Sequence, residues 1–311
     1  MVQAVAMGPS DSVVITGATG EIGCKLTTAF CSSGYKVYAA YRDRNKVQEL
    51  LQEIMQNDES KANKPSFFEL NLNINNGQRR IEIPAFGSCS TCPHEILINA
   101  AGVCLGGNHR EAMLQSLLVN AIGPLTIARG VVQGYAFKGH NDRRLTIVNI
   151  SSGEGEKCYL NSEIIRDLES ISTCRELESY INSLIRQYDA TNGISSGNEM
   201  GNYEYAHGIS PWYSVSKALL NKGTLLLQQE IDLSLQQQSV ASGNNINNNV
   251  RVLACCPGNV ASPMSTPEEL DQLHTTLTPA TEAAAEIFQL ATNWDQYPGG
   301  RFYRHTAVIP W

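Results

Sequence analysis

A tyrosine and a lysine, Tyr213 and Lys217, stand four residues apart in a segment with a helical pattern. At this spacing the two side chains lie on the same face of a helix. A free phenol has a pKa of about 10, and a neighbouring ammonium group favours the phenolate and lowers that value. A tyrosine held in this way can exchange a proton with a substrate oxygen near neutral pH. The spacing alone does not separate such a pair from two surface residues.

Three polar motifs directly follow apolar, β-branched runs that read as strands. These motifs are Asn99-Ala100-Ala101-Gly102, Asn149-Ile150-Ser151-Ser152-Gly153 and Pro257-Gly258-Asn259-Val260. A further amide, Asn120, lies in a long helical pattern. Ligands of open parallel sheets bind outside the carboxyl ends of the strands. We therefore expect these motifs to gather at one edge of a sheet, where ligands bind.

A glycine-rich turn precedes all of these motifs, in Thr16-Gly17-Ala18-Thr19-Gly20-Glu21-Ile22-Gly23. It follows the first expected strand and opens a helix. The pyrophosphate of a dinucleotide binds to backbone N–H groups at such a helix N-terminus, and glycines allow the backbone to approach it closely. A plain strand-to-helix turn is the alternative. The position after the first strand favours a dinucleotide site.

The end of the second expected strand indicates which dinucleotide binds. An acidic residue there normally holds the ribose 2′-hydroxyl of NAD, but here the strand is followed by Arg42. An arginine can instead pair with a 2′-phosphate through charge-assisted hydrogen bonds, which favours NADP, and Arg44 is a second candidate for that contact. In the alternatives, both arginines are solvated loop charges, or a different loop path brings Asp43 to the ribose.

Taken in order, the NAAG, serine, Tyr-x-x-x-Lys and PGxV motifs make the sequence resemble the short-chain dehydrogenase/reductase family over essentially the whole chain. The resemblance implies an α/β class with a Rossmann-type, doubly wound parallel sheet. It also implies a catalytic tetrad of Asn120, Ser152, Tyr213 and Lys217. Tyr213 would be the general acid in carbonyl reduction, and Ser152, favoured over Ser151, would hydrogen-bond the substrate oxygen. Lys217 would hold the nicotinamide ribose and lower the pKa of Tyr213, while Asn120 would support a water-linked proton relay.

The resemblance carries over a set of cofactor-binding positions, some with departures from the family pattern. Asn71 stands where an Asp often meets the adenine ring, and Ser262 stands where a Thr usually bonds the nicotinamide amide. The expected NADP-binding residues are Gly17, Thr19, Gly20, Glu21, Ile22, Gly23, Arg42, Asn71, Leu72, Asn99, Ala100, Gly102, Tyr213, Lys217, Pro257, Gly258, Val260 and Ser262. No metal site is expected, because Cys89 and Cys92 lack a second ligand pair at a suitable distance.

Within the family, the chain looks most like the monomeric carbonyl reductases. The insertion of about 153–208, the segment Cys255–Met264 and the ending Gly299–Trp311 carry this likeness. It implies an NADPH-dependent reduction of a ketone, aldehyde or quinone carbonyl. We expect a monomer, because helices of the insertion would cover the helical face that relatives use to form tetramers. Trp212 and Met264 are candidates for the substrate pocket.

Two other functions remain open. The spacing of Gly17, Gly20 and Gly23 is more typical of the extended branch of the family, which suggests an epimerase or dehydratase acting on a nucleotide sugar. The short chain after Lys217 and its PGxV motif argue against that function. The other alternative is a non-catalytic NADP-binding sensor or scaffold, which would not require the intact tetrad.

Alternating hydrophobic patterns predict the elements that must position these residues in one domain spanning 1–311. Expected strands are 13–15, 36–41, 67–72, 95–99, 145–150 and 250–255, and expected helices are 22–33, 47–55, 111–132 and 214–236. Within the insertion, apolar residues at intervals of three or four predict two short helices, and Thr173 with Glu176 fits a capping box. Segment 73–94 is expected to be irregular, and 239–249 to be a polar surface loop.

The composition argues against several other classes of protein. The 311 residues carry a net charge of −7, which argues against a dedicated nucleic-acid binder and against polybasic docking to a membrane. No apolar run approaches the roughly 18 residues of a membrane span, and the start lacks the pattern of a secretory signal. Nine scattered cysteines do not form a disulfide framework and suit a reducing compartment. We expect a cytoplasmic protein whose partner is a small carbonyl compound.

Overall fold

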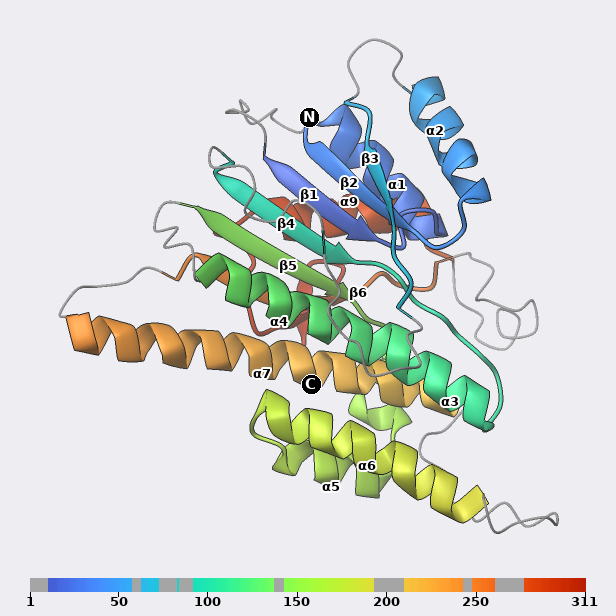
Figure 1. Cartoon of the computed structure of the whole chain (residues 1–311), viewed down its shortest axis with the longest axis vertical. Helices are drawn as coiled ribbons and strands as arrows, with labels where there is room; N and C mark the ends of the chain where they lie inside the picture. The colour runs from blue at the N-terminus through green and yellow to red at the C-terminus, as the bar shows by residue number, and fades with distance from the viewer. Residues whose placement is uncertain are drawn as a thin grey trace.

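The computed structural model describes residues 11–57, 63–72, 83, 92–136, 143–192, 210–242, 248–260 and 277–311. They form an eight-stranded sheet in the order β3-β2-β1-β4-β5-β6-β7-β8 (Figure 1). The strands are β1 (Ser12–Thr16), β2 (Lys36–Tyr41), β3 (Ser66–Glu69), β4 (His94–Asn99), β5 (Arg144–Ile150), β6 (Val250–Cys256), β7 (Phe302–Arg304) and β8 (Ala307–Ile309). All neighbours pair in parallel except β7 and β8. The expected α/β class and Rossmann-type sheet are confirmed, and the strand order reverses between β1 and β4, where such sheets bind ligands.

Helices cover both faces of this sheet. They are α1 (Glu21–Ser32), α2 (Asn45–Asn57), α3 (Arg110–Leu117), α4 (Gly123–Ala136), α5 (Ser162–Ser170), α6 (Cys174–Asn192), α7 (Pro211–Ser242) and α9 (Ala280–Thr292). In Figure 1, α1 and α9 lie on one face, while α4 and α7 lie on the other. Alternate residues of β1 serve the two faces: Val13 and Ile15 pack with α1 and α9, and Val14 packs in the core of α4 and α7. Both faces are buried, as in other parallel sheets.

The sequence patterns located most of these elements to within a few residues. The third strand ends at Glu69 rather than at residue 72. Helix α7 extends to Ser242, so the first part of the segment expected to be a polar loop is helical. The structure adds α9, β7 and β8, which the patterns did not assign. Most of the segment 73–94 lies outside the described residues.

The expected helix 111–132 is observed as α3 and α4, joined by a π-helical turn, η1 (Leu118–Ile122). The continuous helix Arg110–Tyr135 is, by length and composition only, long and apolar enough to span a membrane. However, 67% of its most apolar window is buried inside the structure, between the sheet and α7. This burial is typical of a core helix in a doubly wound sheet.

The insertion contains the two expected helices, α5 and α6, which lie along the outer side of α7 (Figure 1). Their buried side chains join the core shared with α4 and α7. At the start of α6, the Thr173 hydroxyl accepts a hydrogen bond of 3.1 Å from the Glu176 N–H. The Glu176 carboxylate accepts from the Ser172 N–H at 2.7 Å, and hydrogen bonds from both Ser172 and Thr173 lower its pKa. The expected capping box is therefore present at the start of α6.

Candidate functional site

The strand register brings three of the motifs to one edge of the sheet. Thr16 at the end of β1 pairs with Asn99 at the end of β4, and Asn99 pairs with Asn149 of β5. The Asn99 amide donates a hydrogen bond of 2.8 Å to the Asn149 side-chain oxygen. The Asn149 amide in turn donates to the Thr224 hydroxyl of α7 at 2.8 Å. This buried chain fixes the edge of the sheet against the helix that carries Tyr213.

The glycine-rich turn has the shape that a pyrophosphate requires. Gly17 has φ +64°, and a Cβ there would lie 2.6 Å from the Ala101 Cα. A Cβ on Gly23 would lie 2.1 Å from the Gly17 oxygen. Gly20 is the N-cap of α1 and offers no side chain, so the N–H groups of the first helical turn are left for a ligand. The residues present therefore fit a dinucleotide phosphate group.

The structure describes the residues after β2 and β3 that are expected at the adenosine end of the cofactor site. Arg42 and Arg44 are exposed just beyond β2. The exposed Asp43 carboxylate accepts a hydrogen bond of 3.0 Å from the Asn45 N–H at the start of α2. Leu72, one of the expected cofactor-binding residues, is buried in the core and packs beside Gly123.

Tyr213 and Lys217 lie on the first turns of α7, as the spacing predicts. The Lys217 ammonium donates a hydrogen bond of 2.8 Å to the Ile150 carbonyl and lies 5.5 Å from the centroid of the Tyr213 ring. Burial lowers the pKa of Lys217 to about 8. The lysine is thus anchored at the carboxyl end of β5, beside the tyrosine.

The pKa of Tyr213 departs from the sequence expectation. Burial of the phenol raises this pKa above its ordinary value, and the hydrogen bond with Ser152 only partly opposes that effect. The expected lowering by Lys217 is therefore wrong for the protein without ligands, since desolvation dominates. The contact supports the choice of Ser152, because the Ser151 hydroxyl instead donates to the Lys217 carbonyl at 3.3 Å.

Asn120 occupies the π-helical turn η1 and is fully buried. Its side-chain oxygen accepts a hydrogen bond from the Val103 N–H, and its amide donates to the Val103 carbonyl, both at 2.8 Å. The amide also donates to the Ser216 hydroxyl at 3.0 Å. Asn120 therefore connects the loop after the NAAG motif to α7, between Tyr213 and Lys217.

Sequence reasoning missed the contacts that hold the loop after Ser152. The Glu154 N–H donates to the Ser152 hydroxyl at 3.3 Å, and the Glu154 carboxylate accepts from Ser214 at 3.0 Å. Farther along, Glu156 forms an ion pair with Arg304 of β7. Single carboxylates in a loop carry no sequence signal of such pairing, because their partners depend on the fold.

The PGxV motif forms a second glycine turn at the end of β6. Gly258 has φ +80°, and a Cβ there would lie 2.7 Å from the Thr278 hydroxyl. Val260 forms an isolated parallel bridge with Thr278. Ser262 and Met264 lie outside the described residues, so their expected contacts stay predictions.

Trp212 and His94 are both buried in the core. The indole N–H of Trp212 donates to the Asn108 side-chain oxygen at 2.6 Å, and the side chain is fully buried. Trp212 therefore packs in the core, whereas the sequence analysis expected it to line the substrate pocket. His94 contacts the Thr146 hydroxyl at 2.8 Å in the core. Cys89 lies outside the described residues, among which no group of three His, Cys, Asp or Glu side chains could hold a metal.

Comparisons with known proteins agree with this geometry. The family profile described as short chain dehydrogenase matches residues 11–163. The NADP-dependent 3-hydroxy acid dehydrogenase YdfG of Escherichia coli K12 is 26% identical over 208 residues, which cover 62% of this chain and 76% of that protein. A protein of the same name from Shigella flexneri has the same identity and coverage. Over residues 11–163 the chain is therefore similar to the short chain dehydrogenases, in agreement with the resemblance that its motifs carry.

Solved structures share the fold. Salutaridine reductase from Papaver somniferum superposes with a TM-score of 0.62 at 19% identity, covering 94% of this chain and 99% of that one. A variant of the actinorhodin polyketide ketoreductase with NADPH superposes with a TM-score of 0.59 at 17% identity, covering 96% and 97%. These neighbours support the fold, and the expectation of NADP agrees with the cofactor named for YdfG and for the ketoreductase.

Proposed function

We propose that this protein is an NADPH-dependent oxidoreductase that reduces the carbonyl group of a small ketone, aldehyde or quinone. The observation that carries the proposal is the contact of Ser152 with Tyr213 beside Lys217, at the sheet edge where the glycine turn lies. It joins a proton donor to a site shaped for a dinucleotide. A carbonyl reductase needs both parts at the same place.

The binding residues fit NADPH, which supplies a hydride when bound. Gly17, Gly20 and Gly23 form a cradle that side chains would fill, and the start of α1 favours negative charge there. Exposed Arg42 is placed beyond β2 to pair with a 2′-phosphate. Lys217, anchored on the Ile150 carbonyl, offers its remaining N–H groups to the nicotinamide ribose.

Within this proposal, Tyr213 donates a proton to the carbonyl oxygen as that oxygen gains negative charge. The phenol is protonated at neutral pH and so carries the proton that reduction requires. The Ser152 hydroxyl, which is hydrogen-bonded to the phenol, holds the substrate oxygen beside Tyr213. Asn120 keeps the Val103 loop and α7 in place and is proposed to support the proton relay.

A second candidate substrate class is the 3-hydroxy acid and its oxo counterpart. The observation in favour is the name of the YdfG relatives, which match this chain over 208 residues. The chemistry at Tyr213 would be the same, because a 3-oxo acid also presents a ketone for reduction. Both classes therefore belong in the same substrate screen.

We also propose a monomeric, cytoplasmic protein. The supporting observation for the monomer is that α5 and α6 lie along α7 and share the core of α4 and α7, so they cover part of the helical face expected to form tetramers (Figure 1). No disulfide joins the cysteines among the described residues, which suits a reducing compartment. Light scattering at micromolar concentration tests the monomer, and a tetramer would refute it.

The proposed activity is tested by measuring NADPH and NADH oxidation with a panel of quinones, aldehydes, ketones and 3-oxo acids. We expect turnover with NADPH on at least one carbonyl class, and its loss in Tyr213→Phe with NADPH binding retained. Activity on UDP-sugars with none on carbonyl compounds would favour the extended-type epimerase or dehydratase. Tight NADPH binding without turnover on any substrate would favour the sensor or scaffold.

A further inference from the structure

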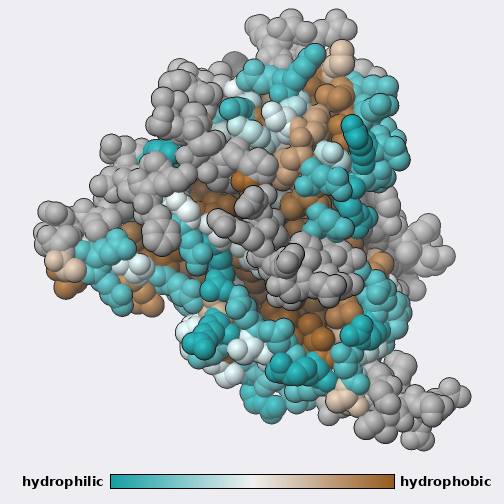
Figure 2. All heavy atoms as spheres, viewed as in Figure 1, coloured by the Kyte–Doolittle hydropathy of each residue, from teal (hydrophilic) through white to brown (hydrophobic). Residues whose placement is uncertain are grey.

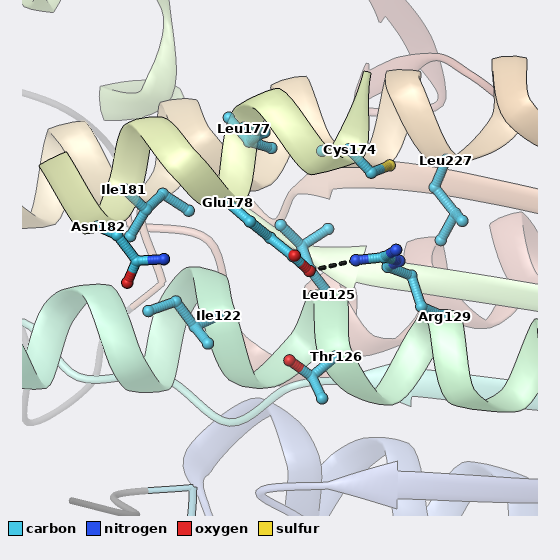
Figure 3. A pocket seen from close by; sticks show the side chains of 11 residues that line it. Ile122, Leu125, Thr126, Arg129, Cys174, Leu177, Glu178, Ile181, Asn182 and Leu227 are labelled. Atoms are coloured by element: carbon cyan, nitrogen blue, oxygen red, sulfur yellow. Dashed lines mark hydrogen bonds and ion pairs between the residues drawn. The ribbon is translucent and has the colours of Figure 1, made fainter. Parts of the chain in front are cut away.

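A cavity of about 300 Å³ lies between the insertion and the main sheet layer, away from the tetrad. Its walls come from η1 with α4, from α6 and from α7 (Figure 3). The lining residues are Ile122, Leu125, Thr126, Arg129, Cys174, Leu177, Glu178, Ile181, Asn182, Gly223 and Leu227. Sites for small organic ligands begin at about this volume.

The cavity has apolar walls with one pair of charges across it. In Figure 3, Arg129 of α4 and Glu178 of α6 point toward one another, with Ile122 and Asn182 to one side and Leu227 to the other. Figure 2, which has the same view as Figure 1, shows apolar surface in the lower half of the molecule, flanked by hydrophilic atoms. Such a site suits a molecule with an apolar body and a single charged group.

The two charges differ in exposure, which indicates the sign of the ligand's charge. The Arg129 side chain is 32% exposed, while that of Glu178 is 58% exposed. Ion pairs this exposed contribute on the order of 1 kcal/mol or less. Glu178 can therefore turn into solvent at little cost, whereas Arg129 stays at the cavity and needs an anion.

The other polar lining groups do not compete for this role. Burial raises the pKa of the Cys174 thiol to about 12, so it remains neutral. Thr126 and Asn182 offer hydrogen bonds without charge. Among the lining residues, Arg129 is thus the cation available to a ligand, and Glu178 is the anion that a ligand must replace.

We propose that this cavity binds a small amphipathic carboxylic acid. The ligand's carboxylate takes the place of Glu178 on Arg129, and its apolar body contacts Leu177, Ile181 and Leu227. Arginine pairs well with carboxylates through parallel hydrogen bonds, and burial of the apolar body supplies the additional affinity. This site is separate from the proposed catalytic site, although Ile122 shares η1 with Asn120, and Leu227 shares α7 with Lys217.

The test is calorimetric titration of the full chain with octanoate and, as a neutral match, with 1-octanol. We expect octanoate to bind more tightly than 1-octanol. Arg129→Met should weaken octanoate binding about tenfold, with little change for 1-octanol. Glu178→Gln should instead strengthen octanoate binding, because it removes the competing carboxylate. A purely structural ion pair would not give these opposite effects, since either substitution breaks the same pair.

Two further variants complete the design. Thr126→Phe places a ring in the cavity and should abolish octanoate binding, with circular dichroism confirming the fold. Glu169→Gln removes the partner of Lys157 in another surface ion pair and should leave octanoate binding unchanged. The proposal is refuted if octanoate does not bind the native chain at millimolar concentration, or if its affinity in Arg129→Met and Thr126→Phe equals that of the native chain. Because binding is measured directly, the result does not depend on the proposed reductase activity.

Discussion

The indole N–H of Trp311 donates a hydrogen bond of 2.7 Å to the carbonyl oxygen of Gly155, in the loop that follows Ser152. On its other side, Gly155 lies so close to α7 that a Cβ would come within 2.8 Å of the Lys217 carbonyl carbon. The ion pair of Arg304 with Glu156 holds the next turn of the same loop. Contacts of Trp311 and Arg304 therefore hold the loop after Ser152 next to the helix that carries Tyr213.

This relationship predicts that Trp311 positions the serine without touching the reacting atoms. Trp311→Ala should lower kcat about tenfold, because misplacing a group that is held for reaction raises the barrier, and NADPH affinity should change little. Trp311→Phe keeps an aromatic ring without the N–H donor, and its kcat should fall between those of the native chain and Trp311→Ala. Steady-state kinetics and NADPH titration measure the effect.

Val308→Ala is the matched control for Trp311, because Val308 is an exposed residue of the neighbouring strand β8. It should leave kcat unchanged. If Trp311→Ala instead altered only the affinity for NADPH, the C-terminal segment would contribute to cofactor binding, and its proposed action through Ser152 would be wrong.

Cofactor preference is predicted to depend on Arg42. Arg42→Ala should raise KM for NADPH roughly tenfold or more, since a hydrogen bond to a charged group contributes about 1.5–3 kcal/mol. KM for NADH should change little, because NADH has no 2′-phosphate. Arg44→Ala in parallel shows whether the second arginine shares the contact. An equal effect of Arg42→Ala on both cofactors would contradict the assigned role.

The parts of the fold that were predictable from sequence have local causes. Val13, Val14 and Ile15 form a β-branched run that ends at a glycine turn, and β-branched residues are enriched in strands. The parallel topology then brings Asn99 and Asn149 together, because consecutive strand ends meet at one edge. Local patterns and one topological rule therefore account for the edge that carries the site.

The missed features depend on contacts between distant segments. The π-helical turn at Asn120 is stabilised by Val103 and Ser216, which no local pattern connects. The direction of the Tyr213 pKa shift depends on how deeply the phenol is buried, and the spacing to Lys217 says nothing about that depth. In contrast, α9 was within reach of sequence reasoning, because its alanine-rich segment has strong helical propensity.

The glycine turn offers a matched pair of substitutions. Gly23→Ala places a Cβ 2.1 Å from the Gly17 oxygen and should open the turn, so NADPH binding should be lost or weakened by more than about tenfold. Gly130→Ala, in the interior of α4, meets nothing within 4 Å. It should preserve NADPH binding and stabilise the protein by up to about 1 kcal/mol, because alanine has the higher helix propensity. Fluorescence titration and urea unfolding measure the two effects, and retained NADPH affinity in Gly23→Ala would refute the cradle.

Acid stability is predicted to depend on the buried His94. Burial, with smaller effects of Arg251 and Arg144, lowers the pKa of His94 from 6.5 to about 3. Between these two values the unfolded chain binds a proton at this histidine and the folded protein does not, so the free energy of unfolding falls as the pH falls below 6.5. Above pH 6.5 both states are neutral and the effect is absent. From about pH 7.5 to about pH 5 the loss attributable to His94 should be about 2 kcal/mol.

Urea unfolding of the native chain and of His94→Gln at these two pH values isolates this contribution, because the glutamine amide can still reach the Thr146 hydroxyl but does not titrate. The native chain should lose about 2 kcal/mol more than the variant over the interval. His305→Gln, at an exposed position paired with Glu286, controls for removal of a surface histidine. Equal losses in the native chain and in His94→Gln would mean that the imidazole is protonated within the folded core. The contact with Thr146 would then have to be a charge-assisted bond rather than one made by a neutral ring.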